Sequence, residues 1–359
     1  MPLNVAGKKL IIFAGKGGVG KTTCSSATAL HVSKTGKKTL VVTVDPAKRL
    51  KDSLGLEVGA SEAQVAPNLY AMMFDPRTVI EEYLAKSHPD QKEKVVKHPL
   101  FKYVTNNLPG LNELLAIGKL VDLQDQGTYE VIVVDTAPTG HALTFLSAPQ
   151  QVKELFEEQS LVHVALRFYR IYRRLKKASK GLLGWLKSEE VEDVPEVDFE
   201  ALFKQVAAEA TRISNMLTDH DRTVLNIVTI PEKLPVEESI ELHEKVANQL
   251  KINVGAVIVN KVQPDSLQDL WGDFQRLRED EPTKEHLKRE VAKRGYRAEM
   301  WGKVVQTVEF AALRRQMNMR YLDQLRKAIP VPIVEVPLHR EDVSGLASLE
   351  EFRALLFSG

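Results

Sequence analysis

The stretch Gly15-Lys16-Gly17-Gly18-Val19-Gly20-Lys21-Thr22-Thr23 decides the fold of this chain. It follows an apolar run, residues 10–14, that predicts a buried strand, and it precedes small residues at 25–31 that predict a helix. A strand, a glycine-rich loop and a helix in this order are typical of a phosphate-binding loop, because glycines let backbone N–H groups surround a phosphate. We therefore predict a nucleotide site at residues 15–23, with Lys21 on the outer phosphates and Thr22 holding Mg²⁺.

Composition limits the classes of protein that are possible. The 359 residues include 49 Lys or Arg and 48 Asp or Glu, a net charge of +1, so no general attraction to nucleic acid is implied. The single cysteine, Cys24, excludes an intrachain disulfide. The first residues lack the layout of a secretory signal, and no uncharged apolar run approaches the ~18 residues of a membrane-spanning helix. We expect a soluble, cytoplasmic protein without a nucleic-acid partner.

Two further apolar runs carry an aspartate at or near their carboxyl ends. Residues 39–47 and 129–135 predict buried parallel strands, and they contain Asp45 and Asp135. An aspartate in this position lies beside the ligand crevice of an open α/β sheet. Asp135 matches the carboxylate that accompanies magnesium in phosphate-loop enzymes. Asp45 either orients the water that attacks the γ-phosphate or caps the next helix, and the local sequence does not decide between these roles.

The remaining strands predict the fold class. Residues 68–74, 223–229, 254–261 and 333–338 predict strands that alternate with helical segments. We predict an α/β fold of the P-loop NTPase class, with a mainly parallel β-sheet flanked by helices. Long, charge-rich helical stretches interrupt the strands, so we also predict a helical insertion subdomain.

A basic, amphipathic segment lies between residues 155 and 187. Its apolar residues recur at three- and four-residue spacing, as on one face of a helix, and arginines and lysines surround them. The pattern is compatible with a membrane-surface helix, a nucleic-acid patch, a mobile lid for an apolar client, or a core helix with a basic outer face. The residues that we predict for a client groove are Phe168, Tyr172, Leu175, Leu182, Leu183, Trp185 and Leu186.

Three segments together resemble one known family. Residues 16–22 carry an additional lysine, Lys16, near the start of the loop. With this lysine the stretch resembles the deviant phosphate loop of a dimeric ATPase class. Residues 45–47 (Asp-Pro-Ala) and 135–143 (Asp-Thr-Ala-Pro-Thr-Gly-His-Ala-Leu) resemble the first and second switches of the arsenical-pump and tail-anchored-protein-targeting ATPase family. The resemblance spans the whole chain in order, so it implies a single ATPase unit over residues 1–359.

The resemblance also implies a ligand and residue roles. ATP is the nucleotide, Mg²⁺ is its metal, and the protein is a homodimer in which Lys16 reaches the nucleotide of the partner. The catalytic residues are then Asp45, Lys16 and Lys21, and the residues around the metal are Thr22, Asp45 and Asp135. The implied nucleotide contacts are Gly15, Lys16, Gly17, Gly18, Val19, Gly20, Lys21, Thr22, Thr23, Asn260 and Pro337.

The prediction of adenine contacts rests mostly on where residues stand in the chain relative to the family's motifs. Asn260 lies at the end of a predicted strand, where the family reads the adenine edge, although an ordinary asparagine turn explains it equally well from local sequence. Pro337 begins a segment, to residue 343, that stands where the family contacts the base.

The expected division of the chain follows the same resemblance. The nucleotide-binding core takes approximately residues 1–76, 120–150, 222–262 and 328–359. The helical subdomain for a client or partner takes approximately residues 77–119, 151–221 and 263–327.

The cysteine count separates this chain from some branches of the family. It has no Cys-x-x-Cys pair to bind zinc, and one cysteine cannot hold an iron–sulfur cluster or a thiolate arsenite site. We expect a Mg²⁺-dependent ATPase that works as a nucleotide-switched homodimer and targets or chaperones apolar, tail-anchor-like membrane-protein helices. The alternative is an arsenical-pump-like motor that energises or regulates a membrane-protein partner without a thiolate metal site. In either case we expect membrane association only through a partner.

Overall fold

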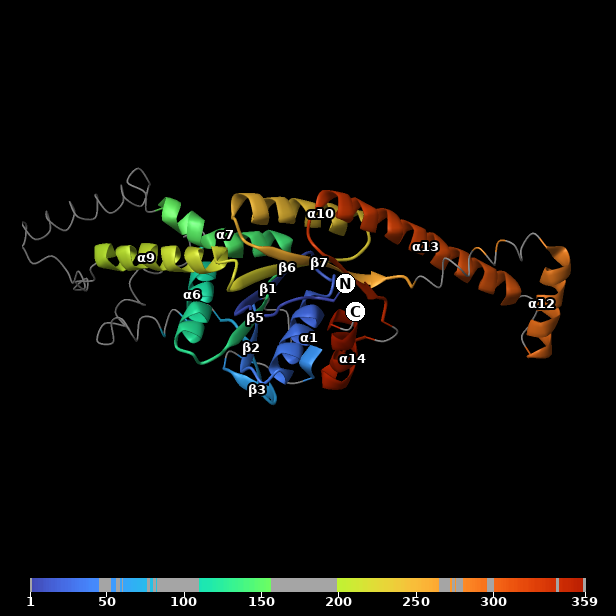
Figure 1. Cartoon of the computed structure of the whole chain (residues 1–359), viewed down its shortest axis with the longest axis horizontal. Coiled ribbons are helices and arrows are strands. Elements are labelled where there is room, and N and C mark those ends of the chain that lie inside the picture. The colour runs from blue at the N-terminus through green and yellow to red at the C-terminus, as the bar shows by residue number, and fades with distance from the viewer. Residues whose placement is uncertain are drawn as a thin grey trace, which may run out of the picture.

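The computed structural model describes residues 2–44, 53–55, 59, 61–75, 78–79, 82, 110–155, 199–264, 272, 275, 280–295, 300–339 and 342–357. In this part of the chain eight strands form one sheet, in the order β3-β4-β2-β5-β1-β6-β7-β8 (Figure 1). Neighbouring strands are parallel except β3 and β4, which are antiparallel. The predicted α/β fold with a mainly parallel sheet is confirmed.

The strands match the apolar runs of the sequence closely. They are β1 (Leu10–Ala14), β2 (Thr39–Thr43), β3 (Ala63–Ala66), β4 (Leu69–Met73), β5 (Val131–Asp135), β6 (Thr223–Thr229), β7 (Val254–Val262) and β8 (Ile333–Pro337). All residues of β1, β2, β5 and β6 are buried, which explains their unbroken apolar or β-branched sequences.

Helices cover both faces of this sheet. The helices of the described part of the chain are α1 (Lys21–Lys34), α6 (Leu111–Asp125), α7 (Thr139–Leu155), α9 (Phe199–Thr218), α10 (Lys233–His243), the π-helical η2 (Glu244–Gln249), α12 (Glu281–Lys293), α13 (Met300–Ala328) and α14 (Gly345–Phe357). Figure 1 shows α12 at one end of the molecule, away from the sheet. Figure 1 shows α1 and α14 on one side of the sheet, and α7, α9, α10 and α13 on the other.

The central strand β1 divides the core into two layers. Leu10, Ile12 and Ala14 belong to the apolar cluster with α6, α7, α9, α10 and α13. The intervening residues, Ile11 and Phe13, belong to the cluster with α1 and α14. Side chains of a strand alternate between the two faces of a sheet, so β1 anchors both layers and fixes the start of the loop that follows it.

The structure adds detail that the sequence patterns did not predict. The antiparallel edge strand β3 lies in no predicted strand. The helical segment between β6 and β7 consists of α10 followed by the π-helical turn η2. All eight strands lie within the ranges expected for the core, and α6 and α9 also pack on the sheet, against β5 and β6. The division into a core and a helical subdomain stays a prediction.

Candidate functional site

The candidate site lies where the carboxyl ends of the central strands meet. The loop 15–20 connects β1 to α1, and it is held by close backbone packing. Gly15 has φ +152°, and a Cβ there would lie 2.0 Å from the carbonyl oxygen of Val228 on β6. Gly20 is the N-cap of α1 with φ +103°, a conformation that side-chain-bearing residues rarely adopt. The path of the loop therefore requires glycine at positions 15 and 20.

Lys21 is the first residue of α1 and points back over the loop. Its side chain is 5% exposed, and Nζ donates a hydrogen bond to the carbonyl oxygen of Lys16 at 2.9 Å. The ammonium group and the amino end of α1 both place positive charge inside the loop. This arrangement is suited to the outer phosphates of a nucleotide.

Thr22 and Asp135 lie side by side at the next strand end. The Thr22 hydroxyl donates to Asp135 Oδ2 at 2.7 Å, and the Thr43 hydroxyl at the end of β2 donates to the same oxygen at 3.2 Å. Asp135 is the last residue of β5 and is buried. Mg²⁺ prefers hydroxyl, carboxylate and water oxygens, so this oxygen-rich set fits that metal, with Thr22 and Asp135 as the residues that would hold it.

The side chain of Asn260, on β7, forms a hydrogen bond to the phosphate loop. Its Nδ2 donates to the carbonyl oxygen of Val19 at 3.0 Å, and its Oδ1 accepts from the backbone N–H of Lys261 at 2.9 Å. Lys261 has φ +60°, which is rare for a residue with a side chain. These two hydrogen bonds fix the orientation of the amide, which lines the pocket described below.

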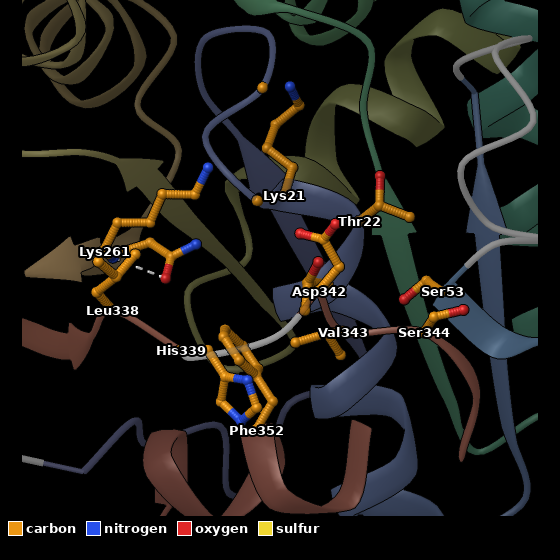
Figure 2. A pocket seen from close by; sticks show the side chains of 14 residues that line it. Lys21, Thr22, Ser53, Lys261, Leu338, His339, Asp342, Val343, Ser344 and Phe352 are labelled. Carbon is orange, nitrogen blue, oxygen red and sulfur yellow. Dashed lines mark hydrogen bonds between the residues drawn. The ribbon is translucent and has the colours of Figure 1, made fainter. Parts of the chain in front are cut away.

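A pocket of about 540 Å³ opens beside these residues, within the size range of small-molecule sites. Figure 2 shows Lys21 and Thr22 of α1 on one side and the segment with Leu338 and His339 on the other. The lining residues are Gly18, Gly20, Lys21, Thr22, Thr23, Ser53, Asn260, Lys261, Leu338, His339, Asp342, Val343, Ser344 and Phe352.

The lining agrees only in part with the residues that we expected from the sequence. Pro337 ends β8 and does not line the pocket, whereas Leu338 and Val343, in the segment that follows it, do. Lys261 directly follows the predicted Asn260, whereas Ser53, Ser344 and Phe352 were not predicted. No short motif marks them, because the fold brings them to the pocket from separate elements. Their role in binding a nucleotide stays untested, as do the predicted contacts.

Lys16 points away from its own pocket. Its Nζ forms an ion pair with Glu238 Oε1 of α10 at 2.6 Å, and Lys16 is not among the pocket-lining residues. The second oxygen of Glu238 accepts a hydrogen bond of 3.4 Å from the Thr139 hydroxyl at the start of α7. The sequence offered no signal for Glu238, one of two adjacent glutamates on a surface helix.

Other predicted residues lie outside the described residues. These are Asp45 and the client-groove residues Phe168, Tyr172, Leu175, Leu182, Leu183, Trp185 and Leu186. Among the described residues no group of three or more His, Cys, Asp or Glu side chains is placed to hold a metal ion. Cys24 is buried within α1, and both burial and the nearby Asp135 carboxylate raise the pKa of its thiol well above the usual range. A soft-metal thiolate site at Cys24 is therefore disfavoured.

Comparison with known proteins identifies the family. The family model described as "Anion-transporting ATPase" matches residues 8–293, a span that contains the phosphate loop, Asp135 and Asn260. The chain belongs to this family. It is an ATP hydrolase with ATP as its nucleotide.

Relatives of this ATPase extend over nearly its whole length. It is 26% identical over 351 residues to "ATPase ASNA1 homolog 1" of Paramecium tetraurelia, covering 97% of this chain and 92% of that protein. It is 26% identical over 353 residues to "ATPase get3" of Aspergillus terreus, and the match covers 96% of this chain and 89% of that protein. It is also 26% identical over 349 residues to a "Putative arsenical pump-driving ATPase" of Prosthecochloris vibrioformis, and the match covers 96% of this chain and 74% of that protein. Both branches of the expected family are thus represented.

Proposed function

We propose that this ATPase depends on Mg²⁺, works as a nucleotide-switched homodimer, and targets or chaperones apolar, tail-anchor-like membrane-protein helices. The observation that carries the ATPase part is the convergence of Lys21, Thr22 and Asn260 on one pocket. Asp135 is held beside them by its hydrogen bond from Thr22. The client part is supported by the second-switch sequence at 135–143 and by full-length similarity to the ASNA1 and get3 proteins.

Each polar residue has a defined part in the proposed reaction. Lys21 and the loop amides bind the β- and γ-phosphates. Thr22 and Asp135 would hold Mg²⁺, which would neutralise phosphate charge. Asp45 positions the attacking water. Lys16 stabilises transition-state charge on the nucleotide of the partner subunit. Asn260 reads the adenine edge.

The described part of α13 offers apolar surface for a client. Phe310, Leu313 and Met317 are 62%, 49% and 51% exposed, and their spacing of three and four residues places them on one face of the helix. The helix belongs to the subdomain that we assign to the client. No described helix is both long and apolar enough to cross a membrane. We further propose a cytoplasmic location, with membrane association only through a partner.

The proposal is tested by client capture. The purified protein, with ATP and Mg²⁺, is mixed with a protein that carries an apolar C-terminal anchor helix, and the anchor protein that stays soluble is measured after centrifugation. We expect capture by the wild type and loss of capture after Ala substitution of Phe168, Tyr172 and Leu175. Leu234→Ala is the matched control, because Leu234 is 60% exposed but lies on α10 in the predicted nucleotide core.

The alternative function is an outcome of the same experiment. Intact ATPase activity without capture of the anchor helix would overturn the targeting role and favour a motor that energises or regulates a membrane partner. Such a motor would work without a thiolate metal site, because the chain has one cysteine and it is buried. For the same reason we assign no zinc site or iron–sulfur cluster.

A further inference from the structure

One carboxylate connects the signature lysine to the second switch. Glu238 projects from α10 with its two oxygens in different contacts. Oε1 pairs with Lys16 Nζ at 2.6 Å, and Oε2 accepts from the Thr139 hydroxyl at 3.4 Å. The side chains of Lys16 and Glu238 are 34% and 37% exposed, so the pair is partly open to solvent and can be broken at modest cost.

Both partners of Glu238 belong to segments that contact the nucleotide in the proposed reaction. Lys16 is in the phosphate loop, and Thr139 follows Asp135 by four residues at the start of α7. The two segments also lie close together, since a Cβ on Gly17 would lie 3.6 Å from Pro138 Cγ. A movement of residues 136–139 would therefore reach Glu238 and, through it, Lys16.

The ion pair competes with any other use of Lys16. An ammonium group held at 2.6 Å from a carboxylate on its own subunit cannot at the same time extend to a phosphate on another subunit. A contact that must be broken before Lys16 can leave its own subunit lowers the apparent affinity of every state that breaks it. The pair thus opposes closure of a dimer that uses Lys16 in trans.

We propose that Glu238 is a positioning residue that retains Lys16 on its own subunit until the segment at Thr139 moves, and so sets how readily the nucleotide-bound dimer forms. This inference rests on the proposed homodimer. The hydrogen bond from Thr139 holds the Glu238 carboxylate toward the loop. Loss of that bond weakens the retention of Lys16 without removing it.

The test compares two adjacent glutamates of α10. Glu238→Gln removes the charge that retains Lys16, whereas Glu237→Gln removes an exposed charge one residue away. Self-association is measured by sedimentation velocity with Mg²⁺ and a non-hydrolysable ATP analogue. We expect the Glu238→Gln dimer to be about 2- to 30-fold tighter than wild type, because a closed dimer breaks two partly exposed ion pairs. Glu237→Gln should match the wild type.

Variants at Thr139 and Lys16 separate positioning from general stability. Thr139→Val should tighten the dimer by less than Glu238→Gln does, and Thr139→Ser should restore the wild-type affinity. Adding Lys16→Met to Glu238→Gln should abolish the gain. Thermal unfolding of each variant checks that it is folded.

Two results would overturn the inference in distinguishable ways. A wild-type dimer with an unchanged or weaker Glu238→Gln dimer would reject the role of Glu238 and leave the proposed function intact. A wild type that binds the analogue but remains monomeric at all concentrations would reject the homodimer, and the inference with it.

Discussion

The Thr22 hydroxyl lies 2.7 Å from Asp135 Oδ2, although the two residues are 113 positions apart in the chain. Thr22 is in the first turn of α1 and Asp135 is the last residue of β5, and β1 pairs with β5 in parallel register. The sheet therefore brings the phosphate loop and the start of the second switch to one point. In the proposed reaction, a nucleotide bound at the loop would therefore lie next to the first residue of the second switch.

Asp135→Asn should uncouple nucleotide binding from Mg²⁺. The amide can still accept hydrogen bonds from the hydroxyls of Thr22 and Thr43, but it lacks the charge that holds the metal. We expect the Mg²⁺-dependent gain in ATP affinity to fall by about 10- to 100-fold, as for other groups that orient a metal and its water. Calorimetric titrations with Mg²⁺ and with EDTA measure this gain. Thr43→Val is the control, since it removes a hydrogen bond to Asp135 but no predicted metal ligand; an equal loss there would assign Asp135 a purely structural role.

Asp45→Asn should preserve ATP binding and slow hydrolysis. If Asp45 positions and deprotonates the attacking water, turnover should fall by at least ~10²-fold. The residue before it, Val44, donates its backbone N–H to the Asp135 carbonyl oxygen at 3.0 Å, so the chain leaves β2 beside the predicted metal site. Phosphate release under single-turnover conditions checks the rate. Near-normal turnover would leave helix capping as the role of Asp45.

The fold was predictable where one physical rule acted alone. β6 has the predicted bounds because a strand buried on both faces must be continuously apolar or β-branched. β3 was missed because its sequence, Ala-Gln-Val-Ala, is short and only partly buried, and its pairing with β4 is antiparallel at the sheet edge. The π-helical turn after α10 has no local sequence signal that distinguishes it from an α-helix.

The site was predictable only where residues are close in the sequence. The phosphate loop is a contiguous motif with a fixed residue spacing, so the sequence alone predicts it. The aspartates at strand ends are predictable because an apolar run precedes each of them. By contrast, Phe352 reaches the pocket from α14, and Glu238 reaches Lys16 from α10, through tertiary packing alone. Contacts of this kind need the sheet order, which periodicity does not provide.

Gly20→Ala should weaken nucleotide binding through Asn260. A Cβ on Gly20 would lie 2.4 Å from Asn260 Nδ2, so the amide must move and lose its hydrogen bond to Val19. We expect ATP affinity to drop about tenfold, which corresponds to the loss of one hydrogen bond of ~1.5 kcal/mol. The left-handed backbone should in addition lower the free energy of unfolding by about 1–2 kcal/mol. Gly36→Ala is the matched control, because Gly36 has φ +89° and nothing within 4 Å of its Cβ position. That variant should lose stability but keep ATP affinity, which equilibrium binding of a fluorescent ATP analogue and urea unfolding would establish.

Cys24 should be inert in the folded protein. Burial, and then the Asp135 carboxylate, raise the pKa of its thiol, and only the thiolate reacts with disulfide reagents. As the chain has a single cysteine, labelling at pH 8 should be negligible in native buffer and reach one thiol per chain in urea. The labelling rate across a urea series should follow the fraction of unfolded protein. Fast labelling without denaturant would show that α1 opens locally.

His31 should make stability fall below neutral pH. Its ring stacks on Phe357 of α14 with centroids 3.7 Å apart, and its Nδ1 lies 3.3 Å from Arg353 Nη1. Burial, and then the Arg353 charge, lower the pKa of His31, although Glu350 opposes this. A lowered pKa in the folded state means that the unfolded chain takes up the proton first. The contribution of His31 is thus present above its unfolded pKa and is lost as pH falls below about 6.5.

A comparison of melting temperatures at pH 7.5 and 5.5 tests this expectation. Between pH 7.5 and pH 5.5 the melting temperature of the wild type should fall by more than that of His31→Gln. The glutamine cannot titrate, and it also lacks the stacked ring. Arg353→Met should reduce the pH dependence in part, because burial of His31 remains when the neighbouring charge is removed. Parallel losses in the wild type and His31→Gln would mean that the contact between α1 and α14 does not respond to protonation, and that acid destabilisation originates elsewhere in the fold.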